Sequence, residues 1–195
     1  MITGFGRFGK HQSNPTKEIL KILPKSIYGH ELIKVELPVI FDECFDYLKS
    51  FIDIHQPDVI FMLGLAGGSE TIRLERVAVN MKDAQIPDNI GAKPQDEPII
   101  SSGKNAYFST LPIRKMEAIL KEKEIPVSIS NSAGLYVCNN IMYHVLHSID
   151  HNNKNTVAGF IHVPYMDEEK PNEEDFSLPL YTLNEAVIDC LKTVL

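Results

Sequence analysis

The chain of 195 residues has no tryptophan, only three cysteines and fewer basic than acidic residues. Its 19 lysines and arginines against 26 acidic residues give a formal net charge of -7. This balance argues against a nucleic-acid partner, because neutralising phosphates requires clustered basic side chains. No apolar run approaches the roughly 18 residues that a membrane helix needs, and the first residues lack the regions of a signal peptide. We therefore expect a cytoplasmic protein without membrane contact.

The three cysteines, Cys44, Cys138 and Cys190, are widely separated and none forms a close pair. Such spacing does not fit a disulfide framework or a zinc site. The cysteines are therefore predicted to form neither a disulfide nor a zinc site, and each is either a buried apolar side chain or a reactive thiol.

Segments with strand-like and helix-like periodicity alternate along the chain. The predicted strands cover residues 1–5, 30–40, 58–65, 71–81, 127–130 and 156–163. The predicted helices cover residues 15–23, 41–55, 112–124, 135–149 and 177–194. This order is typical of the α/β class, and we expect a three-layer α/β/α domain with a mainly parallel or mixed twisted sheet. We see no repeat or break in composition, so residues 1–195 are expected to form one domain, with a long loop at residues 82–102.

Cys138 follows the predicted strand 127–130 and the small residues of a tight turn at 131–134. It therefore falls close to the start of a helix, where backbone N–H groups and the helix dipole favour a thiolate. The alternative is an inert cysteine on an apolar helix face. Three histidines on or after the same helix are expected on its surface: His144, His147 and His151.

Two further polar residues interrupt predicted strands. His162 ends the apolar strand 156–163, where it is either a general base for a thiol or a hydrogen-bonded core histidine. Glu75 is either a carboxylate that orients such a base or the partner of Arg73 or Arg76 in a surface ion pair. The pattern alone leaves these alternatives open.

Glycines at positions 4, 6 and 9 give the first loop the spacing G-x-G-x-x-G. Nucleotide binding is one interpretation, but the next predicted helix begins only at Pro15 and no P-loop pattern is present. Two aromatic residues in this loop, Phe5 and Phe8, instead favour a small apolar pocket.

Seven short motifs lie in order along nearly the whole chain. They occupy residues 3–5 with 8–9 and 14–15, 63–64 with 66–68, 75–80, 86–89, 107–112, 130–134 with 137–139, and 159–164. In these motifs the chain resembles pyroglutamyl peptidase type I, also called pyrrolidone-carboxylate peptidase. Seven ordered matches are far more specific than any one motif.

The resemblance implies a cysteine omega-peptidase that removes N-terminal pyroglutamate from peptides, on an open α/β fold and without metal or cofactor. When the catalytic roles of the family are assigned to the matching residues, Cys138 is the nucleophile that forms a thioester acyl-enzyme, His162 is the general base and acid, and Glu75 is the orienting carboxylate. The expected partners are small pyroglutamyl peptides, together with copies of the chain itself, because the family includes bacterial homotetramers.

The same resemblance implies a substrate pocket for the lactam ring. Its predicted residues are Phe5, Phe8, Asn14, Leu65, Gln85, Ile86, Tyr136 and Val137. Three of these positions depart from the family, which usually has Gln at Leu65 and Arg at Gln85, and often Phe at Tyr136. The departures at Leu65 and Gln85 motivate an alternative, a degenerate member with weak or altered activity that mainly binds a small lactam-like ligand.

Overall fold

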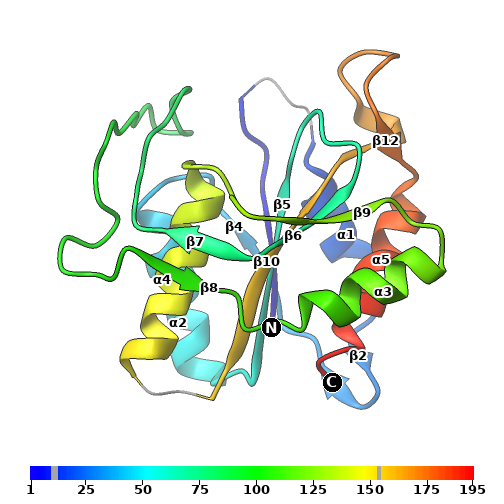
Figure 1. Cartoon of the computed structure of the whole chain (residues 1–195), viewed down its shortest axis with the longest axis horizontal. Coiled ribbons are helices and arrows are strands. Elements are labelled where there is room, and N and C mark those ends of the chain that lie inside the picture. The colour runs from blue at the N-terminus through cyan, green and yellow to red at the C-terminus, as the bar shows by residue number, and fades with distance from the viewer. Residues whose placement is uncertain (10–12, 153–154) are drawn as a thin grey trace.

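A six-stranded sheet forms the middle layer of the molecule (Figure 1). The computed structural model describes residues 1–9, 13–152 and 155–195. Across the sheet the strands are, in order, β4 (Lys34–Leu37), β1 (Ile2–Phe5), β5 (Val59–Leu65), β10 (Val157–Val163), β6 (Ile72–Glu75) and β9 (Val127–Ser130). Neighbouring strands are parallel except β10 and β6, which are antiparallel. The predicted mixed sheet is therefore confirmed.

Helices cover both faces of this sheet (Figure 1). On one face lie α2 (Glu43–His55) and α4 (Val137–His151). On the other lie α1 (Pro15–Ile22), α3 (Ile113–Glu122) and α5 (Leu180–Leu191). Each face has its own apolar core, because side chains alternate along every strand. In the described part of the chain, no helix is both long and apolar enough to span a membrane.

Three two-stranded pairs and one 3₁₀ helix complete the described elements. They are β2 (Ser26–Ile27) with β3 (His30–Glu31), β7 (Val77–Val79) with β8 (Ala106–Phe108), β11 (Tyr165–Met166) with β12 (Ser177–Leu178), and η1 (Asp167–Glu169). The predicted strand 71–81 is divided at Arg76, whose N–H donates to Ser130 and whose carbonyl accepts from Ser109. The predicted helix 177–194 begins only at Leu180, after Pro179.

The predicted long loop at residues 82–102 is present and is fixed to the segments beside β1 and β4. The buried carboxylate of Asp88 accepts the N–H groups of Phe41, Ile90 and Ala92. The Asn89 side chain donates to the carbonyl of Arg7 at 2.9 Å. The loop is therefore held against the chain that follows the first strand.

The histidines of α4 differ from one another. His151 is exposed, as expected. For His144 the expectation of a surface position was wrong, because its ring stacks on Phe45 of α2 with centroids 4.7 Å apart, and burial lowers its pKa to about 4. His147 is also partly buried, with its Nδ1 2.9 Å from the hydroxyl of Tyr107.

Candidate active site

Cys138 is the second residue of α4, so the predicted position near a helix start is confirmed. Tyr136 precedes the helix in an extended conformation and its side chain makes no capping hydrogen bond. Gly134 in the preceding turn has φ 77°, a conformation that favours glycine. The first N–H groups of a helix have no partner within the helix, and the backbone N–H of Cys138 itself is close enough to lower the pKa of the thiol.

The sulfur of Cys138 lies directly over β5. A β-carbon built on Gly64 would be 2.9 Å from Cys138 Sγ and 2.7 Å from the ring of Phe160. Only a glycine lets the thiol approach the strand this closely. In the sheet, Gly64 is the register partner of His162. The thiol of α4 therefore lies over β5 at the level of the imidazole on the adjacent strand β10.

His162 and Glu75 form a buried pair on that face of the sheet. Nδ1 of His162 is 2.9 Å from Oε1 of Glu75, and the two residues are 6% and 0% exposed. Because Glu75 is buried and paired with the imidazole, the alternative of a surface ion pair was wrong. With Nδ1 engaged by the carboxylate, Nε2 is the ring nitrogen left for proton exchange.

Burial raises the pKa of the Cys138 thiol, and the nearby Cys44 and Glu75 add to this effect. Desolvation therefore opposes the effect of the helix start on the thiol, whereas the backbone N–H of Cys138 lowers the pKa. The preference of this helix start for a thiolate stays a prediction. Cys44 and Cys190 are both buried in the cores, and burial raises the pKa of each to about 12.

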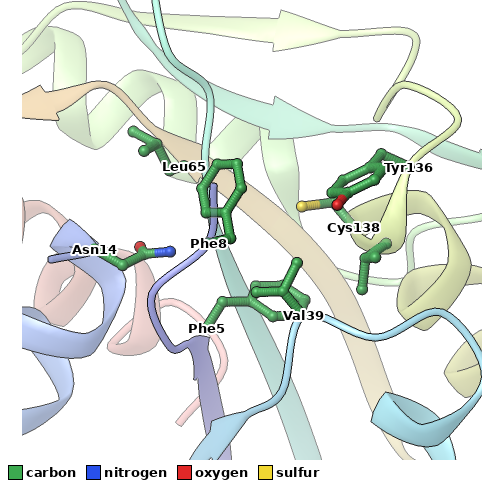
Figure 2. A pocket seen from close by; sticks show the side chains of 8 residues that line it. Phe5, Phe8, Asn14, Val39, Leu65, Tyr136 and Cys138 are labelled. Carbon is green, nitrogen blue, oxygen red and sulfur yellow. The ribbon is translucent and has the colours of Figure 1, made fainter. Parts of the chain in front are cut away.

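A small hollow opens beside the thiol, with a cavity volume of about 50 Å³. Its lining residues are Phe5, Phe8, Asn14, Val39, Leu65, Tyr136, Val137 and Cys138. In Figure 2, Leu65 and Asn14 lie on one side of the Phe8 ring, and Tyr136 and Cys138 lie on the other. The predicted apolar pocket of the first loop is therefore present. Its small size and mainly apolar lining suit a small ring-sized group.

Asn14 is the main polar group in this wall and is held in one orientation. Its side-chain oxygen accepts the N–H of Thr16 at 3.1 Å, which caps α1, and its amide donates to the carbonyl of Gly6 at 3.1 Å. Asn14 is 1% exposed. The residue therefore has a structural role in joining the first loop to α1 as well as a face toward the hollow.

Residues 1–194 match the family model described as pyroglutamyl peptidase. The chain belongs to the pyroglutamyl peptidase family. It is 43% identical over 196 residues to a pyrrolidone-carboxylate peptidase of Thermosipho africanus, covering 100% of this chain and 96% of the relative. It is 42% identical over 194 residues to one of Enterococcus faecalis, covering 98% and 88%.

Solved structures of the pyroglutamyl peptidase family have the same fold. A mutant pyrrolidone carboxyl peptidase from P. furiosus is 40% identical with a TM-score of 0.94, over 98% of this chain and 95% of the other. Pyroglutamyl peptidase I of Bacillus amyloliquefaciens is 34% identical with a TM-score of 0.93, over 97% and 92%.

Two predicted pocket residues of this family member lie outside the hollow. Gln85 and Ile86 are exposed on the loop 82–102, with Ile86 50% exposed, and neither lines the hollow. Their contact with a substrate stays a prediction. Conversely, Val39 lines the hollow but was not predicted. It lies just beyond β4, where its apolar side chain looked like the end of a core strand.

Proposed function

We propose that this chain is an omega-peptidase that removes N-terminal pyroglutamate from peptides with the triad Cys138, His162 and Glu75. The observation that carries the proposal is the sulfur packed on Gly64, whose register partner His162 is held by the buried Glu75. Membership of the pyroglutamyl peptidase family supports the same activity.

The hollow beside Cys138 supports a lactam as the recognised group. Its walls include the apolar side chains of Phe5, Phe8, Val39 and Leu65. A flat, neutral ring fits aromatic and aliphatic walls, and a few backbone groups suffice to bind its N–H and C=O. A free N-terminal glutamate would bring two charges into this apolar hollow and lose their hydration.

The proposed reaction follows from the arrangement of Cys138, His162 and Glu75. His162 takes the proton from Sγ of Cys138 as sulfur attacks the pyroglutamyl carbonyl carbon, and N–H groups at the start of α4 hold the resulting oxyanion. The C–N bond then breaks, and His162 returns the proton to the leaving amine. Water, deprotonated by His162, attacks the thioester and releases pyroglutamate and the thiol. Glu75 stabilises the imidazolium in both steps.

A fluorogenic pyroglutamyl amide tests the proposal under reducing conditions. We expect turnover by the wild type, its loss in Cys138→Ala, and a fall in kcat of about a hundredfold or more in Glu75→Gln, which keeps the shape but removes the charge. Cys190→Ala, in the core on the other face of the sheet, is the matched cysteine control and retains activity. Folded, reduced wild type without turnover, or activity that survives Cys138→Ala, would refute the proposal.

Leu65 favours a second candidate, a member that binds a lactam-like ligand with little chemistry. Its side chain lies in the wall of the hollow and has no hydrogen-bonding group to offer a substrate carbonyl. Under this alternative, Leu65→Gln combined with Gln85→Arg raises kcat/KM by orders of magnitude from a very low wild-type value. A wild-type rate in the ordinary enzyme range removes the alternative.

A further inference from the structure

The strand order places the groups of the site in a line across the sheet. The hollow is built over β1 and the segments that follow β1 and β4. The sulfur of Cys138 lies over Gly64 of β5, and His162 is on β10, the next strand. Because His162 must meet the leaving amine, the peptide beyond the scissile bond continues over β10 toward β6.

Arg73 is on β6, and its register partner is His162. Directly paired residues of antiparallel strands project from the same face. The neighbours Ile72 and Leu74 point into the opposite core, which confirms this direction. Arg73 therefore shares the face of His162 and Glu75, but unlike Glu75 it is partly exposed.

The guanidinium of Arg73 is held at one edge by a buried serine. Its Nε donates to Oγ of Ser69 at 2.9 Å, and the same hydroxyl donates to the carbonyl of Thr71 at 2.8 Å. Ser69 is only 2% exposed. The terminal amino groups carry the remaining donors of the guanidinium, in the fork geometry that matches a carboxylate.

Distances across the sheet indicate which part of a substrate reaches Arg73. β6 lies two strands from β5, about 10 Å at the usual spacing, and an extended peptide advances about 3.3 Å per residue. Allowing for the length of the arginine side chain, the first or second residue after the scissile bond comes within its reach.

We infer that Arg73 determines specificity for pyroglutamyl peptides that carry a carboxylate on the first or second residue after the pyroglutamyl group. The inference rests on the proposed function. The group recognised is an acidic side chain or the free C-terminal carboxylate of a very short peptide. Glu75 is paired with His162, and none of the ion pairs in the described part of the chain joins it to Arg73. The exposed Glu70 in the adjoining turn is the nearby charge that opposes this preference.

The test compares pyroglutamyl-glutamyl-alanine amide with pyroglutamyl-glutaminyl-alanine amide, which differ mainly by one charge. We expect wild type to have the higher kcat/KM for the glutamyl peptide, mainly through KM. The measured ratio is kcat/KM for the glutamyl peptide divided by kcat/KM for the glutaminyl peptide. Arg73→Gln should lower this ratio about fivefold, which is the effect of a favourable exposed ion pair. Arg73→Lys should retain part of the preference for the glutamyl peptide, and added salt should weaken this preference in the wild type.

Arg114→Gln is the matched control, because Arg114 is an exposed arginine of α3 on the opposite side of the sheet. It leaves the ratio unchanged. If wild type cleaves both peptides and Arg73→Gln does not change the ratio, the inference is overturned while the proposed function stands. Equal losses on both peptides indicate a structural role and also overturn it. If wild type cleaves neither peptide, the proposed function fails and the inference with it.

Discussion

The thiol of Cys138 is subject to two opposing influences. Its place in the first turn of α4 favours the charged form, whereas its burial against Gly64 and Phe160 favours the neutral form. Burial raises the pKa of the thiol. Under the proposed triad, His162 generates the nucleophile during the reaction, and the charge of Glu75 matters most when the imidazolium forms.

Alkylation by iodoacetamide tests this balance. A thiol with a raised pKa is protonated at neutral pH, so the alkylation rate of Cys138 should rise about tenfold per pH unit and continue past about pH 8.5, the ordinary cysteine value. Mass spectrometry of the modified peptide gives the rate, and the buried Cys44 and Cys190 serve as internal controls. A rate that levels off below about pH 7 would indicate a thiolate–imidazolium pair and contradict the prediction.

The sequence located the polar residues of the site, because each stands out against its neighbours. Cys138 follows a tight turn, His162 ends an apolar strand, and Asn14 precedes a proline at a helix start. The raised pKa of Cys138 could not be predicted, because the desolvation comes from packing against distant segments. Val39 was missed for the same reason, since the neighbouring sequence does not distinguish an apolar residue of a pocket wall from one of the core.

At the scale of elements, the site depends on how closely the strands β5 and β10 are packed. Gly64 of β5 leaves room for Cys138 Sγ. Gly159 of β10 leaves room for Ser109 and Leu111, whose Oγ and Cδ1 would be 2.2 Å and 2.7 Å from an added β-carbon. Both glycines are buried in central strands, but only Gly64 contacts the thiol.

The two glycines provide a matched pair of variants. Gly64→Ala and Gly159→Ala should each lower the free energy of unfolding by about 1–3 kcal/mol, because both overpack a core. Gly64→Ala should in addition lower kcat at least about a hundredfold by displacing the sulfur, since small errors in position are costly to catalysis. Urea denaturation and kcat of the folded variants measure the two effects. Equal kcat in the two variants would contradict the placement of the thiol.

Strands with a continuous apolar pattern were predicted accurately, as 58–65 and 156–163 illustrate, whereas the division of 71–81 was not predicted. The division occurs at Arg76, whose backbone bonds to Ser130 and Ser109 from distant parts of the chain. Strand β8 was not predicted, because its few residues become a strand only by pairing with β7. Local periodicity contains no information on such partners.

The whole molecule has two apolar cores, and the ring of His144 packs beside one of them. His144 of α4 stacks on Phe45 of α2 with an angle of 10° between the rings. Burial, only partly offset by Asp42, lowers the pKa of His144 to about 4. This histidine is therefore neutral in the folded protein at a pH where it is protonated in the unfolded chain.

The unfolded chain consequently binds more protons than the folded protein between about pH 6.5 and pH 4. The contribution of His144 to stability is present above pH 6.5 and decreases as the pH falls through this window, by up to about 3 kcal/mol.

His144→Phe keeps a ring against Phe45 but removes the titration. Urea denaturation at about pH 7, 5 and 4 should therefore show a smaller loss of stability for His144→Phe than for the wild type. His151→Gln, at the exposed end of α4, is the control and should follow the wild type. Because carboxylates titrate alike in all three proteins, parallel stability curves for His144→Phe and wild type would mean that His144 does not couple the packing of α2 and α4 to pH.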